Sequence, residues 1–317
     1  MLETNELSKS AKGGTELMLE ALHNNVPMDL LDKFQIIPSR VREIDPDRKA
    51  VLWLHDLAGD PEAEHLKEAA SRDRFAAHVF VSHWQMQMYN LVLGFPYHKG
   101  VVLQNAIVPI PQHEKLNDGV VRLIYHTTPH RGLGIVVPVF EHLHKVFQDR
   151  GVQIHLDVYS SFAIYGWADR DKPYQELFDR CKNHPAISYH GSVPNSEIRT
   201  ALQKSDIFAY PCIWEETSCI AAIEALSAKN VIVCPNLAAL PETCANFAMM
   251  YQFSEDAQEH ANRFANSLAQ TITAVKLAKD EQIPEAANMM NFQKQYIDGF
   301  YNWDLRAAQW TRLLQTL

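Results

Sequence analysis

The stretch from Asp206 to Leu226 reads DIFAYPCIWEETSCIAAIEAL. Its beginning, Asp206–Tyr210, is an apolar run that predicts a buried strand, and its end predicts a helix. Short apolar runs alternate with helical patterns along most of the chain, which is typical of βαβ units and parallel sheets. We therefore expect an α/β protein with doubly wound sheets.

Two such series of strands and helices follow one another. The first predicts strands at 34–37, 50–53, 78–81 and 101–103, and the second at 122–125, 154–158, 187–190, 206–210 and 231–234. The segment from Pro109 to Asp118 is rich in turn-forming residues and predicts a linker. We expect a first domain over 1–113, a second over 114–290, and an aromatic-rich helical stretch over 291–317 that packs on a large surface.

Composition narrows the possible functions. The 317 residues include 29 basic and 38 acidic side chains, a net charge of −9, and no basic stripe is present, so nucleic-acid binding is not expected. Five cysteines without a C-x-x-C pair favour a reduced, cytoplasmic setting. The first residues lack the features of a signal peptide, and no run reaches the ~18 apolar residues of a transmembrane span.

The loop and helix of the opening stretch carry the most informative side chains. Thr217 or Ser218 can cap the helix, and free backbone amides at a helix start favour an anion. Glu216 precedes the helix, and Glu224 lies about two turns further along. Carboxylates at these positions can accept hydrogen bonds from sugar hydroxyls. Acidic residues near a helix start are, however, also common in proteins that bind no ligand there.

Glu216 and Glu224 are separated by seven residues, and Tyr210-Pro211 precedes them. This pattern resembles the E-x7-E motif of the retaining glycosyltransferase family 4, and the resemblance covers most of the chain from Lys12 to about Glu242. It implies a GT-B fold, in which two Rossmann-like domains face each other across a cleft and the helical stretch over 291–317 crosses back to the first domain. It also implies a nucleotide-sugar donor bound by Glu216, Glu224 and the helix start at Thr217, Ser218, Cys219 and Ile220.

The segment Tyr125–Leu133 is similar to the Ser/Thr-x-Pro-x-Arg-Gly-Leu turn of that family. The resemblance places Thr127, Thr128, Arg131 and Gly132 around the diphosphate, with Arg131 stabilising the leaving group. Arginine can clamp a diphosphate with two hydrogen bonds. Many members carry a second basic residue a few positions earlier, where this chain has His126 and Thr127. The leaving group is then neutralised either by Arg131 with backbone amides or by a lysine elsewhere, such as Lys204.

Three further segments look like parts of the same family. Gly13 and Gly14 resemble its N-terminal glycine loop, although residues 1–10 are too polar for the strand that normally precedes it, so the first domain is expected to be trimmed. His55 follows a predicted strand and is implied to point toward the transferred sugar. Gly191, Ser192 and Val193 are implied to line the nucleobase through their backbone.

The resemblance thus implies a metal-independent enzyme that uses a UDP- or GDP-sugar and needs no cofactor, with catalytic roles for Glu216, His55 and Arg131. The acceptor is open between a carbohydrate, a lipid-linked group and a protein. No metal site is expected, because Asp169-Arg170-Asp171 lies in a polar loop and His142 and His144 cannot share a helix face. A non-catalytic nucleotide-sugar-binding or scaffold protein is the alternative. A dehydrogenase is disfavoured by the lack of G-x-G-x-x-G after any strand.

Overall fold

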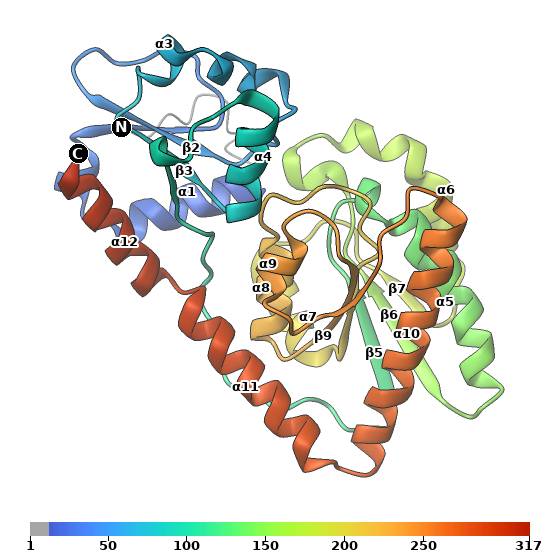
Figure 1. Ribbon diagram of the computed structural model, residues 1–317. Helices are drawn as coiled ribbons and strands as arrows, with labels where there is room; N and C mark the ends of the chain where they lie inside the picture. Colours follow the sequence, from blue (N-terminus) through green and yellow to red (C-terminus); the bar gives the residue numbers. More distant parts are fainter. Residues whose placement is uncertain (1–12) are drawn as a thin grey trace. The chain divides into compact units, whose positions relative to one another are not determined.

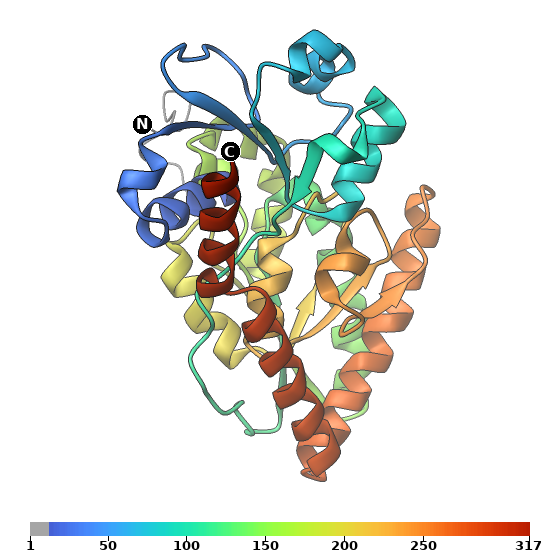
Figure 2. The same ribbon diagram turned by 60° about the vertical axis from the view of Figure 1, so that its left-hand side comes forward.

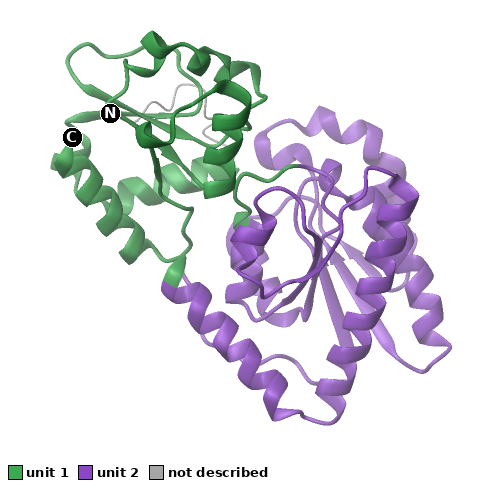
Figure 3. Ribbon diagram, in the orientation of Figure 1, with its two compact units in different colours: residues 1–108, 215–220, 300–317 green, residues 109–214, 221–299 purple. Residues whose placement is uncertain are grey.

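The computed structural model describes residues 13–317, which form two compact units (Figure 3). The first unit contains the chain up to Val108 together with Glu215–Ile220 and Phe300–Leu317, and the second contains Pro109–Trp214 and Ala221–Gly299. Each unit is built on a parallel sheet (Figure 1). The α/β prediction is therefore confirmed. The expectation that residues 1–10 form no buried strand lies outside the described residues.

The sheet of the first unit has four parallel strands in the order β1-β2-β3-β4. The strands are β1 (Phe34–Pro38), β2 (Lys49–Leu54), β3 (Ala77–Phe80) and β4 (Gly100–Val102). The helical elements of this unit are α1 (Gly14–Asn25), α2 (Met28–Leu31), η1 (Pro61–Lys67), α3 (Ala69–Arg72), α4 (His83–Leu93), η2 (Tyr97–Lys99) and α12 (Trp303–Thr316).

Both faces of this sheet are buried, because alternate residues of each strand point to opposite sides. Val51 and Trp53 of β2 join one apolar cluster with α1, α2 and α12. Leu52 and Leu54 join a second cluster with η1 and α4. This two-sided burial explains why the strands read as continuous apolar runs.

The C-terminal helix α12 is part of the first unit. Trp303 and Trp310 are 5% and 0% exposed and lie in the same cluster as Leu22 and Trp53. The rings of Trp53 and Trp310 meet edge to face at 5.0 Å. Figure 2 shows α12, in dark red, beside the helices of this unit. The aromatic residues of this segment therefore build the core of the first unit.

The sheet of the second unit has six parallel strands in the order β10-β9-β8-β5-β6-β7. The strands are β5 (Val120–Tyr125), β6 (Gln153–Val158), β7 (Ile187–Tyr189), β8 (Ile207–Ala209), β9 (Val231–Pro235) and β10 (Met249–Tyr251). The α-helices are α5 (Leu133–Gln148), α6 (Gln175–Asn183), α7 (Asn195–Lys204), α8 (Ile220–Ser227), α9 (Leu240–Cys244), α10 (Ala257–Asp280) and α11 (Pro284–Phe300), with 3-10 helices η3 (Pro129–Arg131), η4 (Phe162–Tyr165) and η5 (Ala168–Tyr174).

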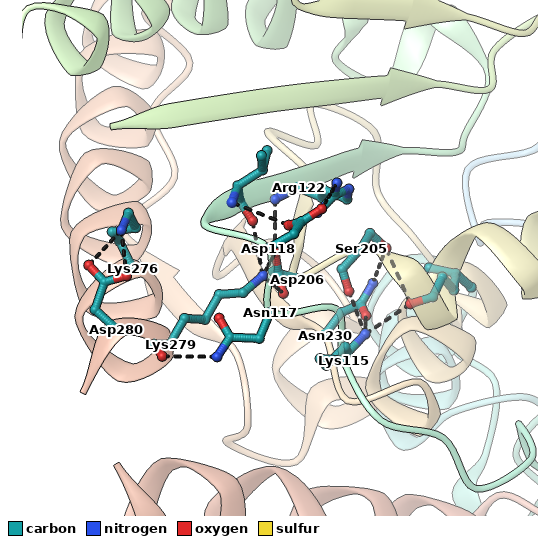
Figure 4. A network of polar contacts seen from close by, with 12 residues as sticks. Lys115, Asn117, Asp118, Arg122, Ser205, Asp206, Asn230, Lys276, Lys279 and Asp280 are labelled. Atoms are coloured by element: carbon teal, nitrogen blue, oxygen red, sulfur yellow. Dashed lines mark hydrogen bonds and ion pairs between the residues drawn. The ribbon is translucent and has the colours of Figure 1, made fainter. Parts of the chain in front are cut away.

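A polar network ties the predicted linker to the amino ends of these strands (Figure 4). Lys279 of α10 donates to the carboxylate of Asp206 at 2.8 Å and to the carbonyl of Val120 at 3.0 Å. Lys115 donates to Asn230 Oδ1 at 2.5 Å, and burial lowers the pKa of Lys115 to about 7. The linker is therefore attached to the second unit.

The observed division differs from the expected domain bounds in three places. The second unit begins at Pro109 instead of 114, because Pro109, Ile110 and Lys115 are bonded to it. The return to the first unit begins at Phe300 instead of 291, and residues 215–220 belong to the first unit. No helix within residues 13–317 is both long and apolar enough to cross a membrane.

Candidate functional site in the second unit and its counterpart in the first

The strand order of the second unit creates a topological switch point between β5 and β8. The chain leaves β5 toward β6 on one side, and β8 lies on the other side. Ligands of open parallel sheets bind outside the carboxyl ends of strands at such a point. The two loops that begin there are residues 126–132 after β5 and residues 210–214 after β8. The first contains the predicted diphosphate residues.

These two loops are in direct contact. Gly132 has φ +140°, and a Cβ on it would lie 2.4 Å from the carbonyl oxygen of Pro211. The amide of Ile213 donates to the carbonyl of Arg131 at 3.2 Å. The ring of His130 contacts the edge of Trp214, with ring centroids 5.1 Å apart. Glycine is needed at position 132 because the other backbone passes so closely.

Four side-chain atoms of the β5–α5 turn are buried without a hydrogen-bond partner within the described chain. They are His126 Nε2, Thr127 Oγ1, Thr128 Oγ1 and His130 Nδ1. Buried polar groups in native proteins are nearly always hydrogen-bonded, and an unpaired one costs about 1–3 kcal/mol. Their concentration in one turn at the switch point gives this turn hydrogen-bonding capacity that no described residue uses.

Arg131 supplies the positive charge of this turn. Burial lowers the pKa of His126 to about 3, and burial with nearby Arg131 lowers that of His130 to about 4, so both rings are neutral at pH 7. Lys204 does not supply a second charge here. It ends α7 and is followed by the amino end of β8, whereas the turn lies at the carboxyl ends of the strands. The suggestion that Lys204 replaces the second basic residue is therefore wrong.

Glu224 lies on α8 and is only 5% exposed. Its carboxylate accepts hydrogen bonds from Arg199 at 2.9 Å and from Asn195 at 3.1 Å, and both donors lie on α7. Burial raises the pKa of Glu224, and the Arg199 guanidinium opposes that rise. The sequence analysis missed Arg199. The signal available was that a buried carboxylate requires a cationic or hydrogen-bonding partner.

The predicted nucleobase loop leads into the same helix. Gly191 has φ +67°, a left-handed conformation that glycine adopts without strain. Gly191, Ser192 and Val193 lie between the carboxyl end of β7 and the start of α7. Asn195 begins α7 and donates to Glu224, so the loop and the carboxylate are connected through one side chain.

In the first unit, the structure brings three other predicted segments together. His55 follows β2, and its carbonyl accepts a hydrogen bond from the Thr217 hydroxyl at 2.8 Å. A Cβ on Gly14 would lie 3.3 Å from Ile220 Cδ1, so the glycine loop lies against the same segment. The structure places Glu216 in this unit, 5% exposed, and Glu224 in the other.

The predicted cap at the start of α8 is wrong for Thr217. The helix begins at Ile220, three residues later, and the hydroxyl of Thr217 donates to His55 instead. Ser218 and Cys219 lie between them, and Cys219 is 2% exposed. The hydroxyl of Thr217 forms a tertiary hydrogen bond and so does not cap the helix.

The acidic triplet at Asp169–Asp171 has local partners. Asp171 accepts hydrogen bonds from the amide of Phe162 at 2.8 Å and from the hydroxyl of Ser161. Asp169 pairs with Lys172 at 2.9 Å on the surface. Among residues 13–317, no three His, Cys, Asp or Glu side chains are grouped so that they could hold a metal ion.

Comparison with known proteins identifies the fold. Residues 128–283 match the family model of glycosyl transferases group 1. No curated protein is significantly similar to the chain in sequence.

Solved structures resemble the whole chain at low sequence identity. HepE from Anabaena in complex with UDP-glucose is 13% identical, with a TM-score of 0.68 over 100% of this chain and 98% of that one. A glycosyltransferase from Rickettsia africae is 14% identical, with a TM-score of 0.65 over 98% and 84%. Sucrose-phosphate synthase from Thermosynechococcus elongatus is 12% identical, with a TM-score of 0.64 over 90% and 73%. The chain thus has the GT-B fold, and its second unit carries the sequence pattern of glycosyl transferases group 1 over residues 128–283.

Proposed function

We propose that the protein is a retaining glycosyltransferase of the family 4 type. It transfers a sugar from a UDP- or GDP-sugar to an acceptor, without a metal ion. The observation that carries this proposal is the β5–α5 turn at the switch point, where buried polar atoms without partners surround a turn that also contains Arg131. The match of residues 128–283 to glycosyl transferases group 1 supports the same assignment.

In this proposal the β5–α5 turn binds the diphosphate. The hydroxyls of Thr127 and Thr128 donate hydrogen bonds to phosphate oxygens, and Arg131 neutralises the charge that develops when the nucleoside diphosphate leaves. Charge-assisted hydrogen bonds of this kind are about twice as strong as neutral ones. Gly132 lets the loop after β8 approach the turn, which fixes the position of its donors.

The carboxylates have separate roles. Glu224 accepts hydrogen bonds from the ribose, because it is held by Arg199 and Asn195 beside the Gly191–Val193 loop that lines the nucleobase. Glu216 binds the transferred sugar, together with His55, Gly13 and Gly14.

Retention follows from attack of the acceptor on the same face from which the diphosphate leaves. The acceptor oxygen forms a bond to the anomeric carbon, the bond from that carbon to the phosphate oxygen breaks, and the phosphate takes the acceptor proton. Charges and atoms therefore balance without an enzymic nucleophile. Arg131 lowers the barrier by stabilising the leaving group.

A non-catalytic nucleotide-sugar-binding protein is the second candidate. The observation that favours it is the neutral His126, at a position where many family members carry a basic residue, because burial lowers its pKa to about 3. A protein with one cation in the turn can retain donor binding and lose the ability to stabilise the leaving diphosphate.

Release of UDP or GDP from UDP-glucose, UDP-N-acetylglucosamine and GDP-mannose tests these alternatives. We expect the wild-type protein to release nucleotide from one of the three donors, at the same rate with and without EDTA, and Glu216→Gln to reduce that rate at least tenfold. Binding of a donor without any release would favour the non-catalytic candidate. Loss of release in EDTA with recovery in Mg²⁺ would contradict the metal-independent mechanism.

A further inference from the structure

Side chains from two neighbouring elements bond the peptide groups of the turn that carries His55. The amides of His55 and Asp56 both donate to the hydroxyl oxygen of Ser39, at 2.7 and 3.2 Å. Ser39 follows β1, the strand next to β2, and it is 7% exposed. Ser39 therefore fixes two consecutive peptide groups, those of His55 and Asp56, in the turn that carries the proposed catalytic histidine.

Gln85 of α4 fixes the carbonyl side of the same turn. Its amide nitrogen donates to the carbonyl of Leu54 at 3.2 Å and to that of Asp56 at 2.9 Å. Its side-chain oxygen accepts from the amide of Val81 at 2.9 Å, so the turn is connected to the end of β3. Gln85 is completely buried. The buried amide of Gln85 thus has three hydrogen bonds to the backbone of the first unit.

Ser39 adopts an uncommon backbone conformation. Its φ is +59°, in the left-handed region that costs free energy for a residue with a Cβ. Burial raises the pKa of Asp56, and a hydrogen bond from the Ser39 hydroxyl opposes that rise. The hydroxyl thus accepts two amide protons and donates its own. Strained residues of this kind persist where the surrounding structure requires them, and they are frequent at functional sites.

The ring of His55 lies at the end of this framework. It contacts the ring of Trp53 at 4.6 Å, and its Nε2 atom has no hydrogen-bond partner within residues 13–317. Its carbonyl is bonded to Thr217, next to Glu216. The backbone of His55 is therefore fixed on both sides, whereas its buried ring nitrogen Nε2 is bonded to none of the described residues.

We propose that Ser39 and Gln85 are positioning residues that hold His55 for its contact with the transferred sugar and that, through His55 and Thr217, set the place of the Glu216 loop. This inference rests on the proposed function. It adds two residues, Ser39 and Gln85, which lie 16 and 30 residues from His55 in the sequence. Misplacement of a reacting group by ~1 Å can reduce a rate about a hundredfold, so residues that only orient His55 can have large effects.

The pair Ser39→Gly and Ser39→Ala separates positioning from stability. Glycine relieves the left-handed strain and removes the hydroxyl, whereas alanine keeps the strain and removes the hydroxyl. We expect both variants to release UDP from UDP-glucose at least tenfold more slowly than the wild type, with UDP affinity changed less than threefold. Ser39→Ala should lower the melting temperature more than Ser39→Gly, because both leave two amides without their acceptor and only glycine relieves the strain. Asn246→Gly, at φ +65° in the second unit, controls for the backbone change.

Gln85→Met tests the second residue, and Gln293→Met is its matched control. Gln293 is also fully buried and also donates to two backbone carbonyls, those of Leu226 and Asn230, but it lies in the second unit. Both variants should lower the melting temperature. Only Gln85→Met should reduce UDP release at least tenfold at a temperature where both proteins are folded.

A double-mutant cycle with His55→Ala decides whether these effects act through His55. If they do, Ser39→Gly in the His55→Ala background changes the rate less than threefold. The proposal would be overturned if the reductions in rate caused by Ser39→Gly and His55→Ala multiplied in the double mutant. It would also be overturned if Ser39→Gly alone kept a rate within twofold of the wild type. The ¹H–¹⁵N signals of the His55 ring give a readout that needs no activity: Ser39→Gly should shift or broaden them, and unchanged signals would also overturn it. A wild-type protein without turnover would refute the proposed function while leaving this readout intact.

Discussion

The turns at the carboxyl ends of the two sheets differ in how far side chains bond their peptide groups, although each turn holds a buried histidine ring nitrogen without a partner among residues 13–317. In the first unit, Ser39, Gln85 and Thr217 satisfy the peptide groups around His55. In the second unit, the β5–α5 turn leaves polar atoms of Thr127 and Thr128 and of two histidines without partners. The first arrangement keeps a geometry in place before any ligand arrives. The second has hydrogen-bonding capacity that none of residues 13–317 uses.

The largest effect on UDP affinity is expected from Gly132→Ala. The new Cβ would lie 2.4 Å from the carbonyl oxygen of Pro211, and φ +140° is unfavourable for alanine, so the turn must move. We expect UDP affinity to fall at least a hundredfold and stability to fall by roughly 2–4 kcal/mol. Gly134→Ala is the control, since nothing lies within 4 Å of the added methyl group. Calorimetry in which Gly132→Ala binds UDP as the wild type does would remove the turn from the site.

Glu224→Gln should have the next largest effect. A hydrogen bond to a charged group contributes about 1.5–3 kcal/mol, so affinity for free UDP should fall at least tenfold. Glu216→Gln is the matched comparison, because the same substitution there should leave UDP affinity nearly unchanged and reduce turnover. Equal losses of UDP affinity in the two variants would show that the proposed division between ribose and sugar is wrong.

Thr128→Val should weaken UDP binding less than the two preceding substitutions, and unlike Gly132→Ala it should not destabilise the protein. Its hydroxyl oxygen is buried without a partner, so an apolar group of the same shape should leave the unfolding free energy unchanged or raise it by about 1 kcal/mol. UDP affinity should fall about threefold to tenfold. Thr217→Val removes a hydroxyl that is hydrogen-bonded to His55, so it should destabilise by about 1 kcal/mol. Chemical denaturation of both variants measures this contrast, and a clear destabilisation by Thr128→Val would contradict it.

The sequence predicted the sheets well for a physical reason. Strands such as β2 and β5 are buried on both faces, so they appear as apolar runs that need no tertiary information. The strand β10 was not predicted, because its three residues, Met249–Tyr251, form too short a run to stand out. The GT-B fold could be predicted because motifs of known spacing accompany these strands.

The site was less accessible from the sequence where it depends on contacts between distant residues. Arg199 lies 25 residues before Glu224, and no local pattern connects them. Thr217 or Ser218 was expected to cap α8, but the hydroxyl of Thr217 bonds to His55, which is 162 residues away. The motif indicated that Gly132 belongs to the site. Only the structure shows why glycine is needed there, namely that the carbonyl of Pro211 leaves no room for a Cβ.

Calorimetric binding of UDP and uridine to the wild type and to Arg131→Ala tests the central claim most directly, that the β5–α5 turn binds the diphosphate of a nucleotide-sugar. The account predicts that Arg131→Ala weakens UDP at least tenfold, because one charge-assisted clamp is lost, and changes uridine affinity less than twofold. Equal losses for UDP and uridine, or a wild-type protein that binds neither, would contradict it.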